Sequence, residues 1–186
     1  MAATPSKMLP LGTKAINFNL LNPVTGSYQS LDELKSDKAT VIAFICNHCP
    51  YVIHINPKLA EIADIYTAQG VSFISINSND VENYPSDSPE NMVKTAKKEG
   101  YNFPYLYDET QDVAKSYQAA CTPDLYVFDG EMSLVYRGQF DSSRPGNAFP
   151  VTGDDLTSAL DAIIEGKPVN SVQKASMGCN IKWKNS

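Results

Sequence analysis

The segment Cys46-Asn47-His48-Cys49 carries the residue types best suited to chemistry in this chain. Two cysteines separated by two residues can close a small disulfide, and a cysteine thiolate is a good nucleophile. A helix N-terminus lowers the pKa of a nearby thiol, because its first backbone N–H groups are unpaired and carry about half a positive charge. We therefore predict a redox couple at the start of a helix. Cys46 is expected to be exposed and attacking, Cys49 to lie one turn into the helix as the resolving thiol, and His48 to add positive charge.

A CxxC pair is also found as half of a zinc site, or as two cysteines that only pack. Zinc takes about four ligands. The remaining candidate ligands are His48, His54, Cys121 and Cys179. None of them forms a second pair at metal-ligand spacing, and a copper site at Cys46, Cys49 and His54 is a further alternative. We predict no bound metal and no cofactor, and keep a metal-binding module or a redox sensor as the non-enzymatic alternative.

Thr122-Pro123 directly precedes a predicted strand. An X–Pro bond carries only a small penalty for the cis form. We predict a cis bond here, because a cis-Pro loop beside a CxxC presents backbone that a substrate chain can pair with. Thr122 and Pro123 are therefore expected to position the substrate, while Asn47 and His48 tune the couple.

Cys121 and Cys179 are candidate auxiliary redox residues. Cys121 lies two residues before Pro123, so it is expected near the CxxC. In the hypothesis of an auxiliary role, the C-terminal tail folds back and Cys179 pairs with Cys121 or relays electrons to Cys46. The alternative is that both are small buried hydrophobic residues, which is how free cysteines usually behave.

The elements that must position these residues form a βαβ unit. The apolar run Ala39 to Ile45 predicts a strand buried on both faces. A helix is predicted over His48 to Gln69, and a second buried strand over Val71 to Ile76, parallel to the first. The polar loop Asn77 to Ser88 is long enough to suggest a functional role, although its residues around Asn79 and Asp80 are typical of a solvated surface.

The rest of the chain predicts further short elements. They are an extended segment over 15–21, a turn at 22–26, helices over 30–34, 88–100, 110–117 and 152–166, a strand at 105–107, and a hairpin of 124–129 with 134–138. The pattern predicts the α/β class, with a central mixed β-sheet flanked by helices. We predict one domain over 1–186, with a core of about 11–166, an N-terminal extension and a less regular tail at 167–186.

Charge and hydropathy exclude several classes of protein. The net charge is −6 from 21 acidic and 15 basic residues, and no basic run exceeds Lys97-Lys98, so nucleic acid and anionic membranes are unsuitable partners. The uncharged stretch Ala39 to Pro57 contains too many polar residues and prolines for a membrane span. Met1 to Gly12 lacks the apolar core of a secretory signal, so a cytoplasmic location is expected.

The order of strand, CxxC, helix, strand, helix, Thr-Pro, hairpin and helix resembles the thioredoxin fold. The stretch from Leu11-Gly12 to Leu34 resembles the lead-in of the redoxin branch, the alkyl hydroperoxide reductase and thiol-specific antioxidant superfamily. Several segments are similar to bacterial peroxiredoxin-like proteins of the thioredoxin family: Phe44 to Val52, Asn77 to Asp80, Tyr136 to Gly138 with Asp141, Ser143 to Gly146, and Gly178 to Lys184.

The resemblance implies a thiol enzyme, but this sequence departs from the pattern of a typical peroxiredoxin. The family's peroxidatic position matches Cys49, its activating Thr position is Cys46, and its Pro position is Ile42. The Arg that clamps the peroxide would fall near Pro123, where there is none. We therefore predict a thiol–disulfide oxidoreductase that works through a mixed disulfide, with a thiol-dependent peroxidase as the alternative. Its partners would be a disulfide-bearing protein or small molecule and an external thiol reductant.

Overall fold

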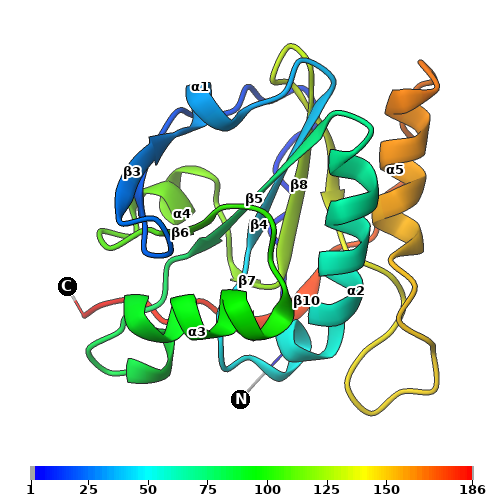
Figure 1. The fold of residues 1–186 in the computed structure, drawn as a ribbon. Helices are drawn as coiled ribbons and strands as arrows, with labels where there is room; N and C mark the ends of the chain where they lie inside the picture. The colour runs from blue at the N-terminus through cyan, green and yellow to red at the C-terminus, as the bar shows by residue number, and fades with distance from the viewer. Residues whose placement is uncertain (1–2, 186) are drawn as a thin grey trace.

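A computed structural model describes residues 3–185, and its centre is the predicted βαβ unit. Strand β4 (Ala39–Phe44) runs parallel to β5 (Val71–Asn77), and helix α2 (Pro50–Thr67) makes the crossover between them. Every residue of β4 is buried, as expected for a strand covered on both faces. The CxxC segment therefore lies at the carboxyl end of the central strand (Figure 1).

The central sheet has seven strands in the order β3-β2-β6-β5-β4-β8-β9. The flanking strands are β2 (Asn19–Asn22), β3 (Ser27–Ser30), β6 (Tyr105–Tyr107), β8 (Asp124–Asp129) and β9 (Leu134–Gly138). The β4–β5 and β5–β6 pairs are parallel and the other pairs are antiparallel, which confirms the predicted mixed sheet. The β8–β9 hairpin has the predicted bounds, whereas β3 was not predicted as a strand.

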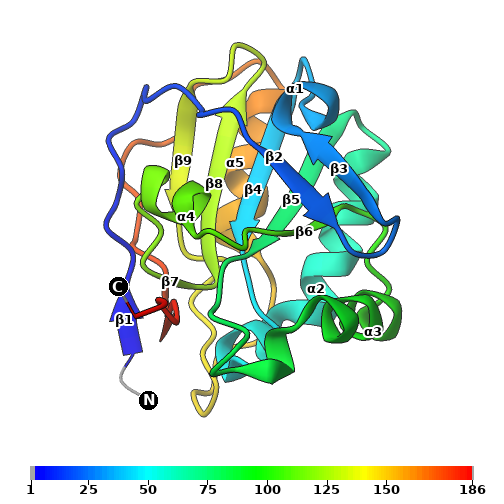
Figure 2. The ribbon, with the colours of Figure 1, turned by 90° about the vertical axis from the view of Figure 1, so that its left-hand side faces the viewer.

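The two faces of the sheet are covered by different helices. The remaining helices are α1 (Leu31–Leu34), α3 (Pro89–Glu99), α4 (Asp112–Ser116), α5 (Asp154–Ile164) and the 3₁₀ helix η1 (Pro85–Asp87). Val41 and Ala43 of β4 point into the core beneath α2, α3 and α5, while Ile42 and Phe44 point into the core beneath α1 and α4. Figure 2 shows α4 in front of the sheet and α5 behind it.

Local signals account for most of the helix bounds. Ser30 and Glu33 form the capping box of α1, and Ser88 caps α3 through the N–H of Asn91. Gly100 ends α3 in the left-handed conformation at φ 71°, where glycine avoids a steric penalty. No helix within residues 3–185 is long and apolar enough to cross a membrane.

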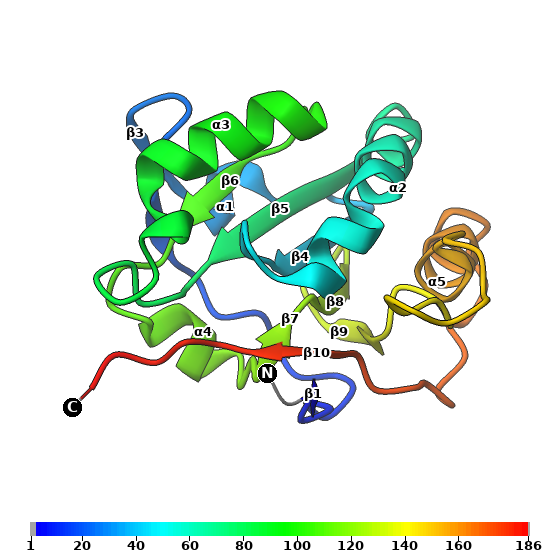
Figure 3. The same ribbon diagram turned by 90° about the horizontal axis from the view of Figure 1, so that it is seen from below.

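The C-terminal tail is more regular than expected, because it contributes strand β10 (Met177–Asn180). β10 lies between β1 (Ala3–Pro5) and β7 (Cys121–Thr122) in an antiparallel three-stranded sheet. Figure 3 shows the tail crossing beneath the molecule beside β7. β10 brings Cys179 opposite Thr122, so the two ends of the chain close over the Thr-Pro segment.

We predict that Gly178→Ala weakens the pairing of β10 with β7. An added Cβ would overlap the Thr122 carbonyl and lie 3.1 Å from the Pro123 backbone nitrogen, so β10 would have to shift away from β7. Overpacking of this kind costs about 1–3 kcal/mol of unfolding free energy. Urea unfolding and the rate of Cys49 alkylation should both report the change. The exposed Ser171→Ala in the same tail is the control, and wild-type values for Gly178→Ala would contradict the prediction.

Candidate active site

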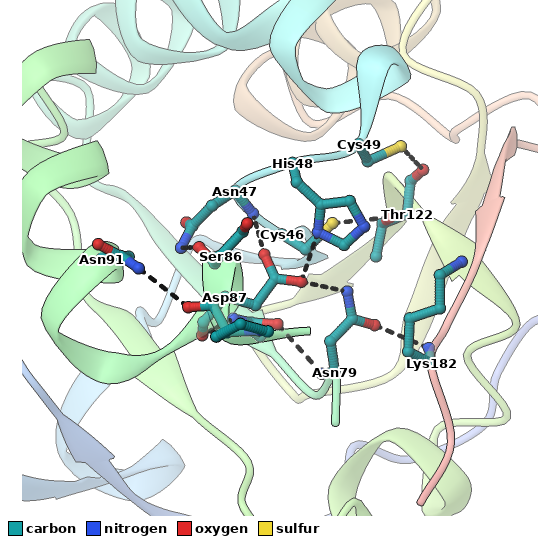
Figure 4. Close-up of polar contacts among 12 residues, drawn as sticks. Cys46, Asn47, His48, Cys49, Asn79, Ser86, Asp87, Asn91, Thr122 and Lys182 are labelled. Carbon is teal, nitrogen blue, oxygen red and sulfur yellow. Dashed lines mark hydrogen bonds and ion pairs between the residues drawn. The ribbon is translucent and has the colours of Figure 1, made fainter. Parts of the chain in front are cut away.

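Cys46 and Cys49 converge on the Thr122-Pro123 segment (Figure 4). The Sγ atom of Cys46 lies 3.4 Å from the Thr122 hydroxyl oxygen, and the thiol of Cys49 donates to the Thr122 carbonyl oxygen at 3.1 Å. The Thr122–Pro123 peptide bond is cis, as predicted. The fold thus joins the CxxC and the Thr-Pro segment, which lie more than 70 residues apart in sequence.

The start of α2 differs from the prediction and changes the position of Cys49. The helix begins at Pro50, so Cys49 is its N-cap residue and does not lie one turn inside. Cys49 has an extended backbone with φ −70° and ψ 122°. The reason is Pro50, whose ring disfavours the helical conformation for the residue before it. Cys49, and not Cys46, therefore lies directly at the helix N-terminus.

Both cysteines are buried, so the expected exposure of Cys46 is not found. Cys46 is 2% exposed and Cys49 is 0% exposed, and both are free thiols. They share one core cluster with Cys179. A substrate can reach these sulfurs only if a covering segment moves.

A residue that the sequence did not single out, Asp87, organises the CxxC loop. Its carboxylate is 0% exposed. It accepts hydrogen bonds from the backbone N–H of Asn47 and the side-chain amide of Asn79, both at 2.8 Å, and lies 2.7 Å from Nδ1 of His48 (Figure 4). The only signal in the sequence was the length of the polar loop, because nothing local distinguishes Asp87 from its neighbours.

The predicted solvated surface at Asn79 and Asp80 was wrong. Both residues are 3% exposed. Asn79 is buried because its side chain joins Asp87 to the tail, accepting from the backbone N–H of Lys182 at 2.8 Å. Asp80 is buried because its backbone N–H bonds the Lys182 carbonyl oxygen and its carboxylate accepts from Asn83. The loop is thus an internal connector between the CxxC and the tail.

Asn47 and His48 are held by the same loop. The side chain of Asn47 donates to the Ser86 carbonyl oxygen at 2.9 Å and accepts from the Tyr105 hydroxyl at 3.0 Å. The ring of His48 stacks on Tyr84, with centroids 5.8 Å apart and an interplanar angle of 6°. Asn47 therefore anchors the loop, and His48 is the residue of the pair that can titrate near the sulfurs.

The two thiols of the couple have opposite acidities. The hydrogen bond from Cys46, helped by the Cys179 thiol and by the backbone N–H groups of Val52 and Cys179, lowers the pKa of Cys49 to about 5. The same hydrogen bond, together with burial and the nearby Asp87 carboxylate, raises the pKa of Cys46 well above its usual range. The Thr122 carbonyl oxygen, which accepts from the Cys49 thiol, favours its protonated form. Of the two thiols, Cys49 is nevertheless the one whose pKa is lowered.

The auxiliary cysteines fall on opposite sides of one short strand pair. Cys179 lies opposite Thr122 and its thiol interacts with Cys49, whereas Cys121 lies opposite Asn180. Neighbouring residues of a strand point to opposite faces, so the hypothesis that Cys179 pairs with Cys121 is not supported. The tail does fold back, as that hypothesis required, but it brings Cys179 into the buried cluster of Cys49.

The donor set that a metal could use differs from Cys46, Cys49 and His54, the set considered above as an alternative copper site. Single ligand atoms of Cys46, His48 and Asp87 lie within 4.8 Å of one another. His54 is not among them, and its Nε2 atom lies 3.1 Å from the Ser143 hydroxyl. Sulfur, imidazole and carboxylate ligands suit zinc. The Asp87 oxygens already accept from two other donors, so the arrangement suits thiol chemistry better.

The sheet order, the CxxC before a helix and the cis-Pro beside it define a thioredoxin-like fold. The thioredoxin domain of a thiol-disulfide oxidoreductase from Bacteroides vulgatus has a similar structure, with a TM-score of 0.59, 18% identity, and coverage of 69% of this chain and 88% of that one. Peroxidoxin BcpB from Mycobacterium tuberculosis matches with a TM-score of 0.62 and 18% identity over 84% of this chain and 96% of its own. These likenesses concern the fold.

The chain belongs to the AhpC/TSA family, whose model matches residues 11–137. It is thus a member of this family with a thioredoxin-like fold. An uncharacterized conserved protein from Geobacillus kaustophilus is 58% identical, with a TM-score of 0.98 over 100% of this chain and 98% of that one. A hypothetical protein from Sinorhizobium meliloti is 46% identical, with a TM-score of 0.96 over 98% and 100%. A thioredoxin-like protein from Haemophilus influenzae is 28% identical over 69% of this chain and 72% of its own.

We predict that the His48–Asp87 pair stabilises the protein more in acid than in alkali. The Asp87 carboxylate raises the pKa of His48. A raised folded-state pKa adds stability below the unfolded value of about 6.5, and this stability is lost as the pH rises through the folded value. In urea unfolding, His48→Gln should therefore cost more at about pH 6 than at about pH 9.

His54→Gln is the matched control for this measurement, because the partner of His54 is a hydroxyl and not a carboxylate. A cost of His48→Gln that stays constant with pH, or grows in alkali, would contradict the role of the ion pair.

Proposed function

We propose that this protein is a thiol–disulfide oxidoreductase whose redox couple is Cys46 and Cys49. The observation that carries the proposal is that two buried thiols both contact Thr122, the residue before Pro123. The lowered pKa of Cys49 and the raised pKa of Cys46 agree with it. A thiolate is the form that attacks a disulfide, whereas a neutral thiol must first lose its proton. The cysteine with the lowered pKa is therefore suited to attack the substrate disulfide, and the other is suited to resolve the mixed disulfide.

The environment of the two sulfurs favours Cys49 as the first nucleophile, which reverses the roles expected from the sequence. The Cys49 thiolate attacks one sulfur of a substrate disulfide, a Cys49–substrate disulfide forms, and the other substrate sulfur leaves as a thiolate. Cys46 then loses its proton and attacks Cys49, and the second substrate sulfur leaves. Two electrons have passed to the substrate, and the protein holds a Cys46–Cys49 disulfide that an external thiol reductant can reopen.

His48 and Thr122 support these steps from opposite sides. A protonated His48 and the Cys49 thiolate stabilise each other, because the charge on Cys49 is one of the causes that raise the pKa of His48. The hydroxyl of Thr122 lies 3.4 Å from the Cys46 sulfur and lowers its pKa, opposing the effect of Asp87. It can therefore donate to Cys46 when this sulfur becomes the attacking thiolate.

The substrate class follows from this chemistry. A disulfide-bearing protein or a small disulfide accepts the electrons, and a thiol reductant supplies them. We place this cycle in the cytoplasm, where reductants keep thiols in the reduced form between turnovers.

A thiol-dependent peroxidase is the second candidate function, and the acidity of Cys49 favours it. Cys49 is the residue at the peroxidatic position implied by the family resemblance, and its pKa is lowered to about 5. Its thiolate would attack a peroxide oxygen, releasing an alcohol or water and leaving a sulfenic acid, which Cys46 would convert to a disulfide with loss of water. Arg144 lines a small pocket with Pro123, but its guanidinium is bound to the carbonyl oxygens of Asp141 and Ser143. This arrangement favours disulfide exchange over peroxide reduction.

We predict that Cys46→Ser in a Cys179→Ser background traps the mixed disulfide on Cys49. The reduced double variant is mixed with oxidised glutathione, quenched in acid, alkylated and mapped by mass spectrometry. Glutathione should accumulate on Cys49, because no neighbouring thiol of the couple remains to displace it. In Cys49→Ser with Cys179→Ser, Cys46 should react about tenfold more slowly, since its thiolate is disfavoured.

Cys121→Ser in the same background is the control for the loss of a buried thiol. Faster glutathionylation of Cys46 than of Cys49 would contradict the assigned roles. The proposed function itself fails if wild-type protein forms no Cys46–Cys49 disulfide at any ratio of oxidised to reduced glutathione.

A further inference from the structure

β10 occupies the place beside the cis-Pro where a substrate chain would pair. Cys179 and Thr122 are direct partners in the antiparallel register. Gly178 is so close to the Thr122 backbone that a side chain there would overlap it. A substrate strand can use this edge of β7 only if β10 leaves it, because each backbone group on that edge bonds one neighbour. β10 thus covers the edge of β7 that a substrate strand would need.

That segment carries a thiol in the same buried cluster as the acidic member of the couple. The Cys179 thiol and its backbone N–H are among the groups that lower the pKa of Cys49. Cys179 is 4% exposed and belongs to the core cluster that contains Cys46 and Cys49. Cys49 therefore has one thiol neighbour within the CxxC and another on β10.

The tail is fixed on both sides of Cys179. Before it, the Ser176 hydroxyl donates to the Pro123 carbonyl oxygen. After it, the Lys182 N–H donates to Asn79 at 2.8 Å and the Lys182 carbonyl oxygen accepts from the Asp80 N–H at 2.8 Å. Asn79 also bonds Asp87, so the network that holds the CxxC loop also holds the tail. This two-sided attachment keeps the Cys179 thiol beside Cys49.

We propose that Cys179 is a third redox-active thiol, which β10 presents to Cys49 in the position of a substrate cysteine. The inference rests on the proposed Cys46–Cys49 couple. In the oxidised protein, the Cys179 sulfur attacks the Cys49 sulfur, a Cys49–Cys179 bond forms and the Cys46–Cys49 bond breaks. Cys46 leaves as a thiolate and takes up the proton that Cys179 loses. The exchange moves the disulfide within the chain with no net oxidation or reduction.

The acidity of Cys179 responds to the state of Cys49. Burial, together with the hydrogen bond and the charge of Cys49, raises the pKa of Cys179 to about 12. A disulfide-bonded Cys49 carries no thiolate charge, so that contribution disappears once the couple is oxidised. Cys179 is therefore a poor nucleophile in the reduced protein and a better one when there is a disulfide to attack.

The position of the disulfide would decide which substrates the protein accepts. A Cys49–Cys179 bond ties β10 to α2 and keeps the edge of β7 closed to a substrate strand. It leaves Cys46 as a free thiol beside Thr122 and His48. The reduced form has no such bond, so β10 can leave and admit a protein substrate.

The test uses Cys46→Ser, in which Cys49 keeps only one thiol neighbour. The reduced variant is treated with oxidised glutathione, quenched in acid, alkylated and mapped by mass spectrometry. Glutathione attached to Cys49 should be displaced by Cys179, giving a Cys49–Cys179 disulfide and one reduced glutathione. Occupancy of Cys49 by glutathione should be about tenfold or more below that of Cys46→Ser with Cys179→Ser, because an intramolecular thiol reacts at a high effective concentration.

Cys46→Ser with Cys121→Ser is the matched control, since Cys121 is an equally buried cysteine on the opposite face of β7. This double variant should still form the Cys49–Cys179 disulfide. Persistent glutathione on Cys49 beside a free Cys179, or a Cys121–Cys179 disulfide instead, would overturn the inference.

Wild-type protein provides a second measurement that does not depend on the folding of a variant. During partial oxidation, peptides linked through Cys49–Cys179 should appear beside those linked through Cys46–Cys49. Their absence while the Cys46–Cys49 disulfide forms would refute the role of Cys179 and leave the proposed function standing. Absence of the Cys46–Cys49 disulfide itself would instead refute the proposed function.

Discussion

The buried carboxylate of Asp87 is the constraint on which the arrangement of the active site depends. A carboxylate removed from water costs several kcal/mol unless donors surround it. Those donors are the Asn47 N–H and the Asn79 amide, with the His48 ring beside them. Because Asn47 belongs to the CxxC loop and Asn79 to the loop after β5, the carboxylate holds these two loops together. The hydrogen bond between the two thiols is the main cause of their different acidities. The Asp87 carboxylate adds to it by raising the pKa of Cys46, and the Val52 N–H at the start of α2 adds to it by lowering the pKa of Cys49.

The network around Asp87 also explains why the tail belongs to the active site. Asn79 joins Asp87 on one side to the Lys182 backbone on the other, and β10 continues from there along β7. The CxxC loop, the Thr-Pro segment and the tail are therefore held as one unit, with the sulfurs of Cys46, Cys49 and Cys179 in one buried cluster. Such an arrangement protects thiols from adventitious reagents, and it makes movement of the tail part of any reaction with a large substrate.

The sequence predicts the parts of this site that depend on local signals. The buried strand β4, the cap and end of α3 and the hairpin of β8 and β9 follow from apolar runs, Ser88 with Gly100, and turn residues. The start of α2 could also have been read from Pro50, since the residue before a proline avoids the helical conformation. The roles of Asp87 and β10 could not be predicted, because each is stabilised by partners far along the chain. Asn47 is 40 residues from Asp87, and Thr122 pairs with Cys179. Their roles become visible only when the fold brings those partners together.

The most direct test of this account is to locate the negative charge in the reduced protein. Thiolate absorbance in the ultraviolet is followed against pH in wild-type protein, Cys46→Ser and Cys49→Ser. The account predicts a transition in the acidic range that persists in Cys46→Ser, where the serine hydroxyl can still donate to Cys49, and that disappears in Cys49→Ser. Loss of the acidic transition in Cys46→Ser, with its retention in Cys49→Ser, would contradict the account and make Cys46 the thiolate.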